Sequence, residues 1–309
     1  MILKINLFLF LAFTSTIIAQ NSLPQVSKGK IERIENFQSK YVTARNIDVW
    51  LPEKYSSDTK YAVLYMHDGQ MLYDAENSWN KQAWNVEEAA SKLLESDSVK
   101  QFIIVGIWNG GSTRHADYFP QKPFETLSEV EKDTVSNQLK NSHVDIDNAF
   151  KPLSDNYLKF IVEELKPHID QNFSVHSDME NTFIAGSSMG GLISMYAICE
   201  YPNIFGGAAC LSTHWPGTFT LDNNPVPQSF MNYLEQNLPN LKNHKIYFDT
   251  GDQTLDSLYP EIQKRVDNIL IENGFDSSNW KTEYFPGEGH SENAWSKRIH
   301  LPLEFLLKK

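Results

Sequence analysis

Short runs of apolar and β-branched residues, each closed by turn residues, recur along the chain from residue 41 onward. Runs of this length and composition are typical of buried strands. They predict seven strands: Tyr41–Leu51, Tyr61–Met66, Phe102–Trp108, Thr182–Ala185, Gly207–Leu211, Lys245–Phe248 and Lys281–Phe285.

Segments with apolar residues at helical spacing lie between these runs. They predict five helices: Val86–Leu94 with Asn85 as its N-cap, Asn156–Ile169, Met189–Glu200, Leu258–Asn273 and Glu292–Leu307. The alternation of strand and helix indicates an α/β protein with a mainly parallel central sheet and helices on both faces. Ligands of such sheets bind beyond the carboxyl ends of the strands.

Residues 119–153 interrupt this alternation with an acidic, proline-containing stretch. A long connection of this kind is often a lid or a binding loop, but a solvated surface excursion fits the pattern equally well. The chain has 309 residues, of which 41% are hydrophobic, and this favours one domain over residues 29–309.

The first residues differ from the rest of the chain. Lys4 precedes a mostly apolar stretch from Ile5 to Ile18, and Ala19 is a small residue suited to cleavage. The pattern predicts a signal peptide over residues 1–19, followed by a flexible segment over 20–28. We therefore expect a secreted or periplasmic protein with no membrane contact after cleavage; an uncleaved N-terminal anchor is the alternative.

The formal net charge of −12 argues against nucleic acid as a partner, because an acidic surface repels phosphate backbones. The sequence does not specify an oligomeric state. Its two cysteines, Cys199 and Cys210, allow either one disulfide or two buried thiols.

The residues Gly186-Ser187-Ser188-Met189-Gly190 match the G-x-S-x-G pattern of a nucleophile elbow. A predicted strand precedes the pattern and a predicted helix follows it, as an elbow requires. Ser188 is the candidate nucleophile, and Ser187 has the wrong spacing from the glycines. The helix N-terminus behind Ser188 favours developing negative charge.

A serine needs a base, and His290 follows the last predicted strand, whereas His300 lies inside the final predicted helix. The carboxylate that orients the base is expected after strand Lys245–Phe248. Asp252 and Asp256 both qualify, and the pattern does not separate them.

The tetrahedral intermediate requires two N–H donors, for which the backbone N–H groups of Met189 and Gln70 are the candidates. His67 and Asp68 have the residue types of a metal pair, but no third ligand has suitable spacing. We therefore expect no metal site, and hydrogen bonds that shape the loop instead.

Four segments together resemble the putative esterase family, which includes feruloyl and acetylxylan esterases, enterochelin esterase, S-formylglutathione hydrolase and the mycolyl transferases. These segments are Tyr65–Gln70, Val105–Gly110, Ala185–Leu192 and Gly289–Trp295. The resemblance implies the α/β-hydrolase fold and a Ser-His-Asp esterase with no cofactor. It favours Asp256 as the acid, because Gly251–Asp256 is similar to a Gly-Thr-Glu-x-Leu-Asp run, although Asp252 stands where threonine is common.

The resemblance also suggests residues that contact the substrate. Arg114 is a candidate for binding an anionic group, with a structural ion pair as the alternative. His214, Trp215 and Trp295 are candidates for lining the pocket, and for the first two the alternative is core packing.

We therefore expect a serine esterase acting on a small-molecule or polysaccharide ester, with acetyl or feruloyl esters on polysaccharide first. A siderophore esterase or an acyltransferase is the alternative among enzymes. A ligand-binding protein without catalysis is the alternative outside them. S-formylglutathione hydrolase is disfavoured, because its substrate is cytosolic.

Overall fold

The computed structural model describes residues 22–146, 149–238 and 244–309. The signal peptide predicted over residues 1–19 lies outside the described residues. Residues 22–28 form neither helix nor strand, but the backbone N–H groups of Gln25 and Ser27 donate to Asp74 and Glu87. This part of the segment therefore contacts the rest of the protein.

Eight strands form one sheet in the order β1-β2-β4-β3-β5-β6-β7-β8. Their bounds are β1 Lys30–Phe37, β2 Arg45–Leu51, β3 Ala62–His67, β4 Phe102–Ile107, β5 Thr182–Ser187, β6 Gly207–Leu211, β7 Lys245–Thr250 and β8 Trp280–Tyr284. The pairs β1–β2 and β2–β4 are antiparallel, and every other neighbouring pair is parallel. The mainly parallel sheet predicted from the sequence is confirmed.

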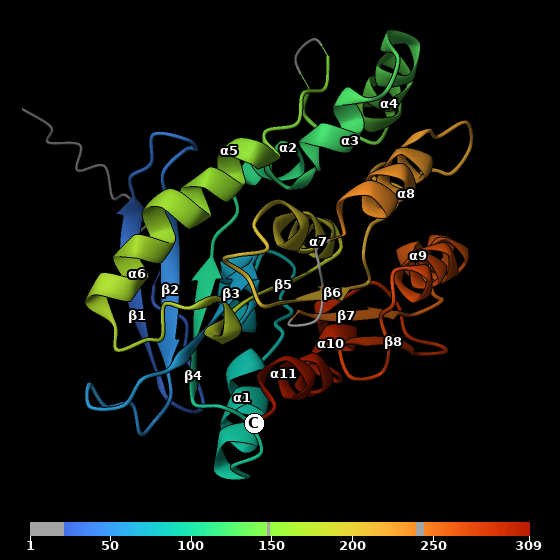
Figure 1. Cartoon of the computed structure of the whole chain (residues 1–309). Coiled ribbons are helices and arrows are strands. Elements are labelled where there is room, and N and C mark those ends of the chain that lie inside the picture. The colour runs from blue at the N-terminus through green and yellow to red at the C-terminus, as the bar shows by residue number, and fades with distance from the viewer. Residues whose placement is uncertain (1–21, 147–148, 239–243) are drawn as a thin grey trace, which may run out of the picture.

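Helices cover both faces of this sheet (Figure 1). One face carries α2 Arg114–Tyr118, α3 Gln121–Glu125, α4 Glu129–Asn141, α5 Ser154–Lys159, α6 Lys166–Asn172, α7 Met189–Glu200, α8 Val226–Asn237 and α9 Pro260–Glu272. The other face carries α1 Val86–Glu95, α10 Glu292–Ser296 and α11 His300–Leu307. A π-helical turn, Phe160–Leu165, joins α5 to α6.

The sheet separates two hydrophobic cores, and the strands supply both by alternation. In β3, Val63 and Tyr65 pack with the helices of the larger layer, while Leu64 and Met66 pack against α1 and α11. All four side chains are at most 1% exposed. Because successive strand residues point to opposite faces, a strand buried on both sides must be apolar throughout.

Several segments differ from the sequence predictions. Strand β1 and helices α2 and α8 were not predicted, and the single helix expected over Glu292–Leu307 is two helices separated by Lys297–Ile299. Residues 119–153 contain α3 and α4, and α3 packs against α8.

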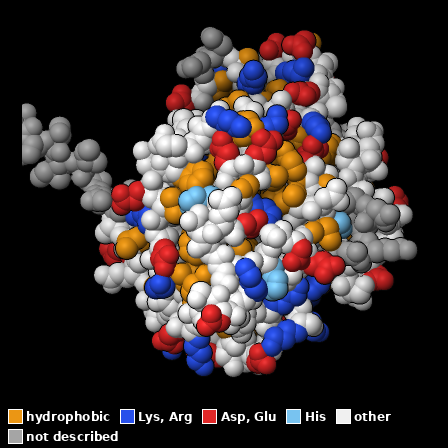
Figure 2. Space-filling view, turned by 60° about the vertical axis from the view of Figure 1, so that its left-hand side comes forward, with side chains coloured by type: hydrophobic (Ala, Val, Ile, Leu, Met, Phe, Trp, Pro, Cys, Tyr) orange, Lys and Arg blue, Asp and Glu red, His pale blue; other side chains and the backbone are white. Residues whose placement is uncertain are grey.

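Cys199 and Cys210 are both free, so the two-thiol alternative describes them. Across the described ranges, no helix combines the length and apolar character needed to cross a membrane. The face in Figure 2 carries basic and acidic side chains interspersed, with hydrophobic side chains exposed between them.

Candidate active site

The candidate residues gather where the parallel strands end. Ser188 follows β5, Ser212 follows β6, and the 3₁₀ turn η6 (Thr254–Leu258), which contains Asp256, follows β7. His290 lies in the connection between β8 and α10. The carboxyl edge of one sheet thus brings together side chains that are about 100 residues apart in sequence.

Ser188 occupies a strained turn between β5 and α7. Its φ of 58° and ψ of −124° lie outside the regions that L-residues favour, a conformation that costs about 1–3 kcal/mol. A Cβ atom at Gly186 would lie 2.7 Å from the carbonyl carbon of Gly190, so only glycine permits this approach. The Ser188 N–H donates to the Leu211 carbonyl at 2.9 Å, which fixes the turn against β6.

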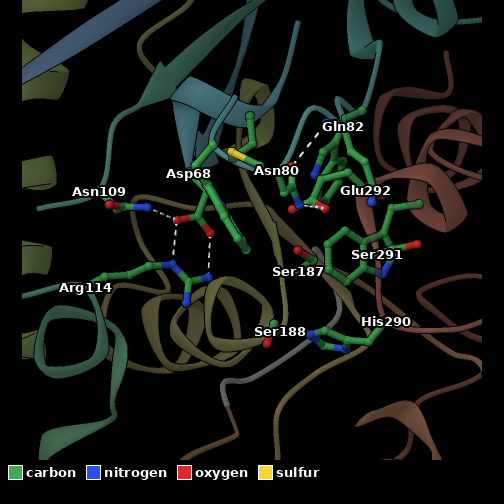
Figure 3. Close-up of a pocket in the computed structure, with 14 residues that line it drawn as sticks. Asp68, Asn80, Gln82, Asn109, Arg114, Ser187, Ser188, His290, Ser291 and Glu292 are labelled. Atoms are coloured by element: carbon green, nitrogen blue, oxygen red, sulfur yellow. Dashed lines mark hydrogen bonds and ion pairs between the residues drawn. The ribbon is translucent and has the colours of Figure 1, made fainter. Parts of the chain in front are cut away.

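His290 is held by Asp256. The distance from His290 Nδ1 to Asp256 Oδ1 is 2.6 Å, and the Asp256 side chain is fully buried. Its other oxygen accepts hydrogen bonds from Gly251 N and Ser212 Oγ, both at 2.7 Å. Figure 3 shows a ring nitrogen of His290 facing Ser188.

Asp252, the other candidate acid, lies on the surface instead. It accepts hydrogen bonds from the Tyr284 hydroxyl at 2.7 Å and from Gly287 N at 2.9 Å. The Tyr284 hydroxyl and these local N–H groups lower the pKa of the Asp252 carboxyl. The structure therefore places Asp256, and not Asp252, against the histidine.

The two candidate oxyanion donors follow two neighbouring strands, β5 and β3. Met189 is the first residue of α7, where a backbone N–H has no acceptor within the helix. Gln70 lies in the turn η1 (Gly69–Met71) after β3. Its side-chain oxygen accepts from Asn109 N at 3.2 Å, which ties this turn to the loop after β4.

A pocket of about 430 Å³ opens in front of these residues (Figure 3). Its lining combines indole rings, amides and charged side chains. The lining residues are Asp68, Met71, Trp79, Asn80, Gln82, Trp84, Asn109, Arg114, Ser187, Ser188, His290, Ser291, Glu292 and Trp295.

One loop contributes much of the lining that the sequence did not reveal. Trp79, Asn80, Gln82 and Trp84 all come from the irregular stretch before α1. The Trp79 side chain is exposed, and Asn80 Nδ2 donates to the Glu292 carboxylate at 2.8 Å. No periodic or motif signal marks these residues; only their proximity to His290 in the fold identifies them.

Comparison with known proteins fits this geometry. The model of the family described as "Putative esterase" matches residues 40–301, which is most of the chain. The chain belongs to the putative esterase family. Strands β2 to β8, Ser188 and His290 lie within the matched region.

Individual relatives of this esterase-family chain are distant. It is 26% identical over 173 residues to Uncharacterized protein YbbA of Bacillus subtilis, and this match covers 55% of the chain and 58% of YbbA. A ferulic acid esterase from Anaeromyces mucronatus has a TM-score of 0.60 at 19% identity, covering 92% of this chain and 96% of that one. The enterobactin esterase FES from Shigella flexneri has a TM-score of 0.63 at 15% identity, covering 92% and 60%. At these identities the two structures show a shared fold.

Arg114 lines the pocket of this esterase-family chain and also forms an ion pair. Its Nε and Nη2 donate to the two oxygens of Asp68, each at 2.7 Å, and Asn109 Nδ2 donates to the same carboxylate. Burial alone would raise the pKa of Asp68, but the Arg114 charge and these hydrogen bonds lower it. Two of the guanidinium nitrogens are thus committed to Asp68.

The aromatic candidates separate into two groups. Trp295 lines the pocket, and its ring meets the His290 ring edge-on at 4.9 Å. His214 and Trp215 do not line the pocket: they are 0% and 1% exposed, and they bond to Tyr259 and Gln263. The core-packing alternative describes these two residues.

The pair His67 and Asp68 has structural partners. His67 Nδ1 lies 2.8 Å from the Tyr157 hydroxyl, and burial lowers the pKa of His67 to about 3, so the ring is neutral. Asp68 is occupied by Arg114. In the part of the chain that the structure describes, no three acidic, histidine or cysteine side chains form a metal-binding group.

Proposed function

We propose that this protein is a serine esterase that hydrolyses carboxylic esters through an acyl-enzyme. The observation that carries the proposal is the 2.6 Å contact between His290 Nδ1 and the buried Asp256, with Ser188 in a strained elbow across the pocket. This is the arrangement by which a carboxylate fixes the tautomer of a histidine that activates serine.

The reaction begins when Ser188 Oγ attacks the ester carbonyl carbon and His290 Nε2 takes the hydroxyl proton. Asp256 accepts the Nδ1–H and stabilises the imidazolium that results. The carbonyl oxygen becomes an oxyanion, which the N–H groups of Met189 and Gln70 stabilise.

Collapse of this intermediate breaks the bond to the alcohol, and His290 gives its proton to the leaving oxygen. The acyl group is now bonded to Ser188 Oγ. Water then attacks the acyl carbon while His290 removes its proton, and a second collapse releases the acid and restores the serine.

For the substrate, we propose an acetyl or feruloyl ester of a polysaccharide. The family membership and the Anaeromyces mucronatus neighbour support this choice. The pocket supports this substrate as well. The exposed indole of Trp79 offers a ring surface, and the neighbouring Asn80, Gln82 and Glu292 side chains offer hydrogen bonds to an alcohol that carries several hydroxyl groups. We further propose that the protein is exported, with residues 1–19 removed.

A siderophore ester is the second candidate, favoured by the fold shared with the Shigella flexneri enzyme. Transfer of the acyl group to a sugar hydroxyl would need the same residues. A ligand-binding protein without catalysis is the candidate from another class, and the contact of His290 with Asp256 disfavours it.

A panel of acetyl, feruloyl, catecholate and longer acyl esters tests the proposal, with Ser188→Ala as the control for each substrate. We expect hydrolysis of at least one short or aromatic acyl ester by the wild type and its loss in the variant. Equal rates for the two proteins would refute the role of Ser188. Turnover only when a sugar acceptor is added would indicate an acyltransferase.

A further inference from the structure

Behind the pocket, four side chains from separate elements close a ring of contacts. Ser212 Oγ lies 2.7 Å from Asp256 Oδ2, and Asp256 Oδ1 lies 2.6 Å from His290 Nδ1. The His290 ring meets the Trp295 ring at 4.9 Å, and Trp295 Nε1 returns to Ser212 Oγ at 2.9 Å. Ser212 and Asp256 are fully buried and Trp295 is 4% exposed, so the contacts among these three side chains are shielded from water, whereas the His290 side chain is 15% exposed to the pocket.

The direction of the Ser212 hydroxyl follows from its partners. Trp295 Nε1 and Arg298 Nη2, at 2.9 and 3.0 Å, can only donate hydrogen bonds. Together they occupy both lone pairs of Ser212 Oγ. Its one hydrogen must therefore go to the remaining neighbour, the Asp256 carboxylate.

The backbone of Ser212 is also fixed. Its φ of 42° is positive, which is uncommon for a residue with a side chain, and its N–H donates to the Asp249 carbonyl at 2.9 Å. Arg298 pairs with Asp249 at 2.9 Å, and the two side chains are only 3% and 0% exposed. A buried ion pair by itself is weak evidence for stability. Here the pair holds Asp249 in place, and Asp249 in turn positions Ser212.

We propose that Ser212 is a positioning residue for the esterase reaction. By donating to Asp256 Oδ2, it turns Oδ1 toward His290 Nδ1 and keeps the base aligned with Ser188. The inference rests on the proposed function, because it assumes that His290 is the base.

Two variants of Ser212 test this inference. Ser212→Ala removes the hydroxyl and keeps the Cβ atom, whereas Ser212→Gly removes the hydroxyl and relieves the positive φ. For both variants we expect kcat to fall by about 10- to 100-fold, which is less than the roughly 10⁴-fold loss seen when a triad acid is neutralised. We expect KM to stay within about two-fold of the wild-type value. Ser229→Ala is the matched control: Ser229 is buried in α8, and its hydroxyl donates to Val226 O within the same helix.

A spectroscopic readout separates positioning from general damage. In the wild type, the His290 Nδ1 proton bonded to Asp256 should give a far-downfield NMR resonance. We expect this resonance to shift upfield or broaden in both Ser212 variants and to remain in Ser229→Ala. Trp295→Phe keeps a ring beside His290 but removes one donor to Ser212, so it should move the same resonance even if the Ser212 variants do not fold.

The outcomes distinguish the two proposals. If Ser188→Ala abolishes hydrolysis while a folded Ser212 variant keeps its kcat within two-fold and its resonance unchanged, Ser212 has no positioning role. An unchanged resonance in folded Trp295→Phe, with no folded Ser212 variant, leads to the same conclusion. If Ser188→Ala remains active, the proposed function itself fails.

Discussion

Replacing Asp256 by asparagine should disable the base while leaving the fold intact. Asp256 Oδ2 accepts from two groups that can only donate to it, Gly251 N and the oriented Ser212 hydroxyl. In Asp256→Asn the amide oxygen must therefore stay with them, and the amide NH₂ must face His290. A donor at that position requires His290 Nδ1 to be an acceptor, which places the ring proton on Nε2.

With its proton on Nε2, His290 cannot take a proton from Ser188. We expect kcat to fall by about 10⁴-fold, equivalent to roughly 5.5 kcal/mol of transition-state stabilisation. Steady-state hydrolysis of 4-nitrophenyl acetate measures this, with Asp252→Asn as the matched control. Asp252 is held by Tyr284 and Gly287 at the surface, so its variant should stay within about two-fold. A near-wild-type rate for Asp256→Asn, or an equal loss in Asp252→Asn, would refute the reasoning.

Three further predictions follow from other parts of the structure. Burial raises the pKa of Glu87 to about 7, so as the pH rises from about 4.5 this carboxyl ionises in the unfolded chain before it ionises in the folded one. The free energy of unfolding of the wild type should therefore fall by up to about 2–3 kcal/mol relative to that of Glu87→Gln between pH 4 and 8, as measured by urea unfolding. A difference between the two proteins that stays constant with pH would contradict this. Trp79→Ala should raise KM for esters of xylo-oligosaccharides by several-fold and leave KM for 4-nitrophenyl acetate unchanged. Equal changes in KM for both substrates would exclude Trp79 as a binding surface for the alcohol. Gly186→Ala should destabilise the fold by about 1–3 kcal/mol in the same unfolding assay, because the added Cβ meets the Gly190 backbone; unchanged stability would show that the elbow can yield.

The sequence predicted the central strands because they are buried on both faces and are therefore almost wholly apolar. Strand β1 lacks this signal: it is an edge strand, Lys30–Phe37, with charged residues among exposed and half-buried positions. Helix α8 was hidden by Pro225 and Pro227, which interrupt a helical pattern in sequence but are compatible with a first helical turn.

The elbow at Ser188 and the late His290 could be recognised because their signals are local in the sequence. The choice between Asp252 and Asp256 could not be made from residue types, since both lie in one polar loop. The path of the loop separates the two side chains in space: Asp252 N and Gln253 N both donate to Glu288 O. This pairing leaves Asp252 at the surface, and the turn η6 that follows carries Asp256 into the interior.

The pocket wall formed by Trp79 and Asn80 had no sequence signal for a different reason. These residues come from an irregular loop, and their place beside Glu292 depends on how residues more than 200 positions apart meet. The role inferred for Ser212 likewise depends on three distant partners: Trp295 and Arg298 near the end of the chain, and Asp256 in η6.

The central claim is that Ser188 is a nucleophile activated by His290, and covalent labelling tests it most directly. The protein is treated with a fluorophosphonate, digested, and mapped by mass spectrometry, alongside Ser188→Ala and His290→Ala. We expect one adduct on Ser188 in the wild type, none in Ser188→Ala, and labelling slowed by orders of magnitude in His290→Ala. An adduct on another residue of a protein that hydrolyses esters, or undiminished labelling without His290, would contradict it.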